Sequence, residues 1–385
     1  MTGTSNIDSF LAGVVRALHR QSEAGWTLPA DALWTDVWTR IEFHGLPLLL
    51  HENAEFLTRW PNQLLDQIAE EARLMVLWET THKNVVTTLL DALSEAQIGT
   101  VMMKGTALAY SLHDDPAIRR RGDTDLLIEP RHKQRTRELL ADLGWYRKPD
   151  PHGLNYQEGW LHDAAGFFSH AVDLHWEPSE RAVLQSVLPL ARFFENRQPL
   201  PRFHHAAYRP DWAIMVLHGA INQKWHEVHG YDTQNGRLVG GRRLIWSYDF
   251  ALLVRAMREE DWNDLSLHCL QSGVAPLVGE ALRDAAADLA FDLPDAPMAR
   301  LENAALDPDI TTYFEELDGL SQFLLDLRKS SSISAKAHLL GSRMFPPRDH
   351  LIEKYPAAQK WPTLALQGRM IAETAGRILR RVVTR

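Results

Sequence analysis

The chain has 385 residues, of which 45% are hydrophobic and 24% are charged, and its formal net charge is -9. The negative balance argues against DNA or RNA as the main partner, because proteins that bind polynucleotides usually present a basic surface. No stretch approaches the roughly 18 consecutive apolar residues of a membrane span. Residues 1–10 lack the basic and apolar segments of an export signal, and a single cysteine, Cys269, excludes an internal disulfide. We therefore expect a globular protein of the cytoplasm.

Residues 1–97 have the apolar spacing of helices. Leu64, Ile68 and Ala72 recur at intervals of four, and this pattern predicts one long helix over about residues 63–97. The proline of Trp60-Pro61-Asn62 is typical of a first helical turn. The sequence therefore predicts an N-terminal helical region.

Residues 98–210 change to a pattern of short strands and helices. In chain order we expect a buried strand at 101–103, a short helix at 107–112, a strand at 123–128 that Pro130 ends, a helix at 131–143 that Gly144 ends, and further short strands within 145–176. Residues 211–385 return to helical spacing, and Asp307-Pro308-Asp309 in that region is typical of a turn. The predicted fold class is α+β: a small mixed β-sheet core flanked by N-terminal and C-terminal helical regions, with regions 1–97, 98–210 and 211–385.

Asp123 and Asp125 are the first candidates for chemistry. They lie two apart on a predicted strand, so both side chains leave the same face of the sheet. Two carboxylates on one face repel each other unless a cation lies between them. Oxygen ligands without thiolates or clustered histidines favour Mg²⁺ or Mn²⁺, which also bind phosphate oxygens. The pair therefore predicts a divalent-metal site.

Other residues of the same region extend this site. Asp173 lies in the strand-like run Val172-Asp173-Leu174 and would supply a third carboxylate. Lys104-Gly105-Thr106 follows the preceding strand, where a backbone turn, a hydroxyl and an ammonium are suited to hold phosphates. Arg119 offers a forked donor for a triphosphate or an acceptor. Together these residues favour a site for phosphoryl-type transfer over the alternative that Asp123 and Asp125 lie on a solvated strand edge without such a role.

Several segments resemble one known family. They are Met103-Lys104-Gly105-Thr106-Ala107-Leu108, Arg119-Arg120-Arg121-Gly122-Asp123-Thr124-Asp125-Leu126-Leu127-Ile128, Val172-Asp173-Leu174-His175-Trp176, Val216-Leu217-His218 and Ile245-Trp246-Ser247-Tyr248-Asp249. Over about residues 40–275 the chain resembles the uncharacterised nucleotidyltransferase family of the polymerase-β-like superfamily. The wider superfamily carries a Gly-Ser pair before the aspartate strand, whereas this chain has Lys104-Gly105-Thr106.

The resemblance implies a nucleotidyltransferase core at 98–210, with Asp123 and Asp125 as metal ligands and Asp173 as third carboxylate or base. It implies transfer of an NMP from an NTP, with Mg²⁺ or Mn²⁺, to a hydroxyl of a small molecule, peptide or protein, with pyrophosphate released. Two other functions fit the Asp-x-Asp pair: glycosyl transfer from a nucleotide sugar, and non-catalytic nucleotide binding. Lys104-Gly105-Thr106 and Asp173 favour nucleotidyl transfer.

Overall fold

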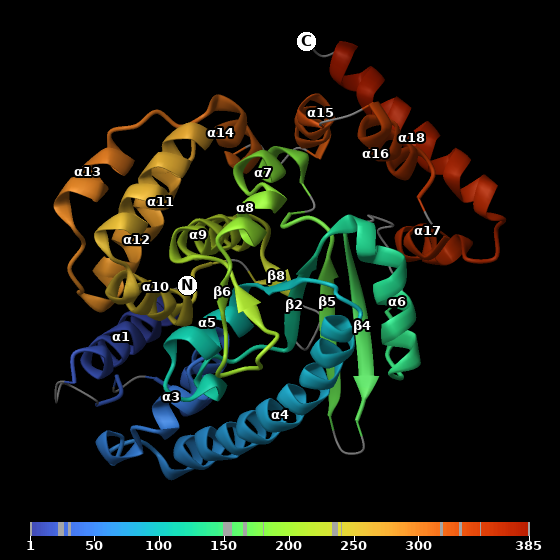
Figure 1. Cartoon of the computed structure of the whole chain (residues 1–385). Coiled ribbons are helices and arrows are strands. Elements are labelled where there is room, and N and C mark those ends of the chain that lie inside the picture. The colour runs from blue at the N-terminus through green and yellow to red at the C-terminus, as the bar shows by residue number, and fades with distance from the viewer. Residues whose placement is uncertain are drawn as a thin grey trace.

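The computed structural model shows a mostly helical chain built around one five-stranded sheet (Figure 1). It describes residues 2–21, 27–29, 32–148, 156–164, 168–179, 181–232, 238–239, 241–315, 319–330, 333–346 and 348–383. None of the helices in these ranges combines the length and the apolar character that crossing a membrane requires. The α+β class that the sequence predicts is confirmed.

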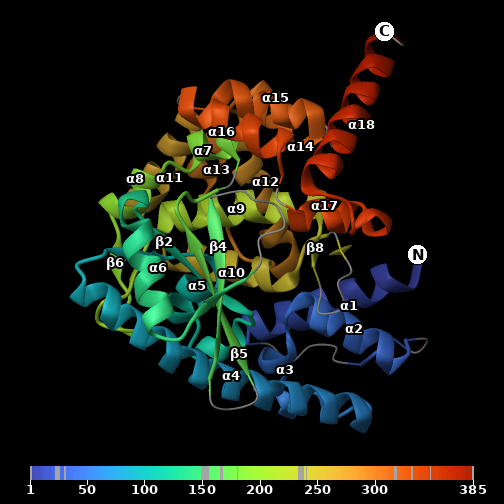
Figure 2. The same ribbon diagram turned by 90° about the vertical axis from the view of Figure 1, so that its right-hand side faces the viewer.

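The N-terminal region is helical, as predicted. Its helices are α1 (Thr2–His19), α2 (Trp34–His44), α3 (Pro47–His51) and α4 (Asn62–Glu95), with a 3-10 turn at Ala54–Phe56. The long helix α4 begins and ends within two residues of its predicted bounds and runs along one side of the molecule in both views (Figures 1 and 2). Its buried face is apolar except for Glu79 and His82, which contact Arg121 and Thr124.

The middle region carries the sheet. Its elements are β1 (Thr100–Met102), α5 (Lys104–Leu112), β2 (Asp123–Ile128), α6 (Lys133–Asp142), β3 (Tyr146–Arg147), β4 (Gln157–Asp163) and β5 (Ser169–His175), with 3-10 turns at Pro116–Ile118 and Pro130–His132. The strand order is β1-β2-β5-β4-β3, and β2 pairs with β5 in parallel while the other pairs are antiparallel. The sheet is therefore mixed, as predicted. Helix α5 begins at Lys104 instead of the predicted Ala107, because the chain turns into the helix directly after Met103.

Short elements lead from the sheet to the C-terminal helices. They are α7 (Ala182–Val187), α8 (Leu190–Glu195), β6 (Gln198–Pro199) and β7 (Tyr208–Arg209). The following elements are α9 (Trp212–His229), β8 (Tyr231–Asp232), β9 (Leu238–Val239), α10 (Leu244–Ala256), α11 (Glu259–Ser272), α12 (Ala275–Leu289), α13 (Asp295–Glu302), α14 (Pro308–Glu315), α15 (Gly319–Lys329), α16 (Ile333–Met344), α17 (Arg348–Lys354), a 3-10 turn at Pro356–Ala358 and α18 (Thr363–Val383). The Asp307-Pro308-Asp309 turn proves to be the start of α14, where the Asp307 carboxylate accepts a hydrogen bond from the Asp309 amide.

The largest apolar core joins the sheet to the helices that follow it. Buried side chains run without interruption from Val86 on α4, through Leu126 and Val172 of the sheet, to Leu217 on α9 and Tyr313 on α14. A second core holds the N-terminal helices together with α10 and α12, and a small third core lies within α17 and α18. Helices α17 and α18 lie side by side in both views (Figures 1 and 2). The sheet and α9 thus pack as one unit.

Candidate active site

The parallel pairing of β2 and β5 places three aspartates on one face of the sheet. Asp125 lies directly opposite Asp173, and Asp123 precedes Asp125 by two positions, so that alternation turns all three side chains to the same side. Asp125 is buried, while Asp123 and Asp173 are partly exposed. Neither Asp123 nor Asp173 makes a hydrogen bond or ion pair with another described residue. The face therefore concentrates negative charge.

Two basic side chains converge on one oxygen of Asp125. Lys104 Nζ donates to Asp125 Oδ1 at 2.6 Å, and His175 Nε2 lies 2.7 Å from the same atom. Burial alone would raise the pKa of Asp125, but the Lys104 ammonium and the His175 hydrogen bond hold it well below its usual range. The carboxylate is therefore ionised, and His175 Nε2 must carry the proton that it donates. Alternation along β5 turns His175 to the same face as Asp173, and its imidazole lies against Asp125.

Asp123 has the opposite electrostatic environment. Burial and then the neighbouring carboxylates of Asp125 and Asp173 raise its pKa to about 7. The three carboxylates do not all approach within 4.8 Å of one another, and Asp125 is paired with Lys104. This excess of charge, with oxygen donors and no thiolate, fits a hard divalent cation. Ligation would require Asp125 to use its second oxygen or to release Lys104.

The start of α5 lies beside these aspartates. Lys104 has a φ of 48°, a left-handed conformation that is uncommon for a residue other than glycine. This conformation turns the chain from β1 into α5, so that the first amide groups of the helix and the Lys104 ammonium occupy the same edge of the sheet. Helix amides and an ammonium are both suited to bind phosphate oxygens. The structure thus brings the Lys104 ammonium to Asp125, with Gly105 next to Lys104 in the first turn of α5.

Thr106 faces the other way. Its hydroxyl lies 3.0 Å from the hydroxyl of Thr124 and accepts a hydrogen bond from Arg121 Nε at 3.1 Å. Thr124 in turn lies 2.8 Å from His82 Nε2 on α4. Because the Thr106 hydroxyl is used on the side of β2 opposite the aspartates, its position does not support the predicted contact with a phosphate through that group. Its role here is to join α5 to β2.

A buried ion pair completes this support. Arg121 Nη2 donates to Glu79 Oε1 at 2.6 Å, and the Tyr110 hydroxyl donates to the same oxygen at 2.6 Å. Both charged side chains are less than 10% exposed. The contacts connect α4, α5 and the segment just before β2, and so fix the position of the aspartate strand. Glu79 carries little local signal in the sequence, since it is marked only as a charge on the apolar face of a helix.

Arg119 is also held inside the protein. Its Nε donates to Asp249 Oδ2 on α10 at 2.6 Å, and His113 Nε2 lies 3.1 Å from the other oxygen of Asp249. The prediction that Arg119 holds a triphosphate gains no support from this position. The arginine instead forms part of the wall of a pocket between α5, α9 and α10. Its partner is 130 positions away along the chain, so spacing could not reveal it.

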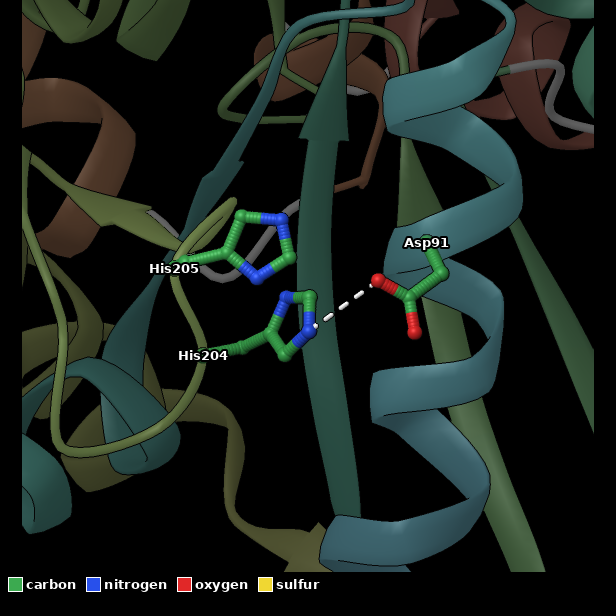
Figure 3. A group of neighbouring side chains, drawn as sticks. All are labelled: Asp91, His204 and His205. Carbon is green, nitrogen blue, oxygen red and sulfur yellow. Dashed lines mark ion pairs between the residues drawn. The ribbon is translucent and has the colours of Figure 1, made fainter.

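A second group of side chains could hold a metal ion, and the sequence reasoning missed it. Asp91 of α4 and the adjacent His204 and His205 bring one potential ligand atom each within 4.8 Å of the others (Figure 3). His204 Nδ1 accepts a hydrogen bond from the Ala206 amide at 3.3 Å, so the ring proton lies on Nε2, which donates to Asp91 at 3.1 Å. A metal ion at Nε2 would require that nitrogen to lose its proton. The contact is therefore a hydrogen bond from a neutral imidazole to a carboxylate, and it joins the β6–β7 connection to α4.

Comparison with known proteins identifies the family of the chain. A comparison with curated proteins found no match. Residues 30–289 match a family described as uncharacterised nucleotidyltransferase, and this range includes β2, β5, α5 and helices α9 to α12. Since the match covers more than half of the chain, the protein belongs to this nucleotidyltransferase family.

Proposed function

We propose that the protein is a metal-dependent nucleotidyltransferase that moves an NMP from an NTP to a hydroxyl group and releases pyrophosphate. The hydroxyl oxygen bonds to the α-phosphorus as the bond from that phosphorus to pyrophosphate breaks, and the hydroxyl proton passes to a base. The observation that carries this proposal is the pairing of Asp125 with Asp173 on one sheet face, with Asp123 and Lys104 beside them. The acceptor is a small molecule or a peptide or protein side chain.

Asp123, Asp125 and Asp173 are the residues that would hold Mg²⁺ or Mn²⁺. Their oxygen donors match the preference of these ions, and the raised pKa of Asp123, caused first by burial and then by the other two carboxylates, reflects charge that a cation would offset. A bound ion of this kind supplies charge neutralisation at the phosphates and activation of the attacking hydroxyl. Asp173, which has no ion pair within the described chain, is suited to accept the hydroxyl proton.

Lys104 and the first turn of α5 are the proposed phosphate contacts. In the protein alone, burial opposes the charge of Lys104, but the carboxylates of Asp125, Asp123 and Asp173 outweigh it and raise the lysine pKa. The ammonium is therefore charged when an NTP arrives. It can exchange Asp125 for a phosphate oxygen, while His175 continues to hold Asp125. The amide of Gly105 adds a donor at the same helix end.

The test compares two pairs of aspartates. The double variant Asp123→Asn with Asp125→Asn removes the proposed metal ligands, and Asp307→Asn with Asp309→Asn changes the other Asp-x-Asp sequence, at the start of α14. Calorimetric titration with each Mg·NTP should show loss of binding in the first variant and wild-type binding in the second.

Activity assays then separate the reaction types. Purified protein is incubated with labelled NTPs and, in parallel, with labelled nucleotide sugars, and pyrophosphate release is measured. Unchanged Mg·NTP affinity in the Asp123/Asp125 double variant would overturn the proposed site. Sugar transfer without pyrophosphate release would replace nucleotidyl transfer with glycosyl transfer.

A further inference from the structure

A pocket opens beside Lys104, between the nucleotidyltransferase core and the helices that follow it. Lys104 and Gly105 lie at its core side, and α9 and α10 form its other walls. Leu108, Phe250 and Leu253 are among its apolar residues. An apolar lining with a few polar groups is typical of sites that bind small organic groups.

Two polar side chains of α9 face this pocket without partners. His218 and Asn222 are one helical turn apart and so lie on the same face of the helix. His218 is only 6% exposed, and within the described chain neither side chain makes a hydrogen bond. The Phe193 ring packs edge-on against the His218 ring, with 5.6 Å between centroids, and fixes its orientation. The two side chains therefore offer donors and acceptors to a ligand that enters the pocket.

The charges around the pocket are already compensated. Arg119 is paired with Asp249, and Lys104 is paired with Asp125. Burial, and then the charge of Lys104, lowers the pKa of His218 to about 3, so this imidazole is neutral and offers one donor and one acceptor. Apart from Lys104, which we assign to the phosphates, the described lining residues offer an anion no unpaired cation, and the apolar side chains give a sugar few partners. A neutral planar heteroaromatic group fits these walls, and Trp246 adds an aromatic surface.

We propose that this pocket binds the nucleobase of the NTP, with His218 and Asn222 as the residues that contact the base edge. The inference rests on the proposed function, because Lys104 connects the pocket to the aspartates that would receive the phosphates. An amide and a neutral imidazole on adjacent turns can each donate and accept, which is the chemistry that distinguishes one base edge from another. His218 and Asn222 are thus specificity-determining residues.

Nucleosides provide a test that does not depend on the metal site. Adenosine, guanosine, cytidine and uridine are titrated separately into the full chain in the presence of a chelator, and binding is measured by calorimetry. At least one nucleoside should bind, and it should compete with Mg·NTP. Asn222→Leu should weaken that nucleoside by about tenfold, the effect of one hydrogen bond lost in an apolar site. Asn84→Leu, at an exposed position of α4, is the matched control and should leave affinity unchanged.

The variants separate this inference from the proposed function. The double variant Asp123→Asn with Asp125→Asn should keep nucleoside affinity while it loses Mg·NTP binding. Absence of binding by all four nucleosides, or equal affinity in wild type and Asn222→Leu, would overturn the pocket assignment even if Mg·NTP turnover persists. A nucleoside that binds but does not compete with Mg·NTP would also overturn the pocket assignment. The pocket would then be the site of the acceptor. If the wild-type protein binds a nucleoside but does not bind Mg·NTP, the result counts against the proposed metal site and leaves the pocket assignment in place.

Discussion

Replacement of Asp123 by asparagine should stabilise the metal-free protein at alkaline pH. The pKa of Asp123 is raised from 3.8 to about 7, by burial and then by Asp125 and Asp173. The folded chain therefore keeps the proton up to about pH 7, whereas the unfolded chain loses it near pH 4, so the destabilisation accumulates between these values and is complete above them. The difference corresponds to about 4 kcal/mol. Because Asp123 is partly exposed, solvent screens the repulsion, and we expect about 2 kcal/mol.

The assay is urea unfolding of wild type and Asp123→Asn in the presence of a chelator, at about pH 8 and about pH 5. The variant should be more stable at the higher pH, and its advantage should fall to less than about 1 kcal/mol at the lower one. Added Mg²⁺ should reverse the order, because an ion bound by the native state stabilises only the chain that retains its ligands. Asp66→Asn, at an exposed position of α4, is the control and should match wild type throughout. A variant no more stable than wild type at pH 8 without metal would refute the charge argument.

Two further measurements address the surroundings of the site. Arg121→Met should lower the free energy of unfolding by about 3 kcal/mol, because it leaves Glu79 buried with Tyr110 as its remaining partner. Addition of Glu79→Gln should recover part of this loss. A loss below about 1 kcal/mol in Arg121→Met would contradict a structural role for the pair. His218 has a folded-state pKa of about 3, lowered by burial and then by Lys104, so its contribution to stability is complete above about pH 6.5 and is lost as the pH falls. Between pH 6.5 and 5 the loss in the free energy of unfolding amounts to about 2 kcal/mol. The free energy of unfolding of His218→Asn should therefore depend less on pH than that of the wild type. Identical pH profiles would show that His218 protonates in the folded protein without a loss of stability.

The sequence allowed prediction of the elements whose signals are local. The strand at 123–128 has the predicted bounds, since an apolar run followed by Pro130 defines it, and α4 follows from its spacing. The parallel register that places Asp125 opposite Asp173 was not predictable, because strand pairing depends on the whole chain. Side-chain partners far apart in sequence were also missed. Arg119 is a residue type that often binds phosphate. Only the folded structure shows that its guanidinium is paired with Asp249.

The continuous apolar core between the sheet and α9 has a consequence for how a ligand is admitted. Domains that close around a substrate usually meet across small, polar interfaces that can open. Here Leu126 of the sheet and Leu217 of α9 belong to one buried cluster, so hinge motion between these parts would expose apolar surface. We therefore expect the walls of the pocket to keep their spacing when it fills. Selection among ligands would then depend on a preformed shape, with little reorganisation of the backbone on binding.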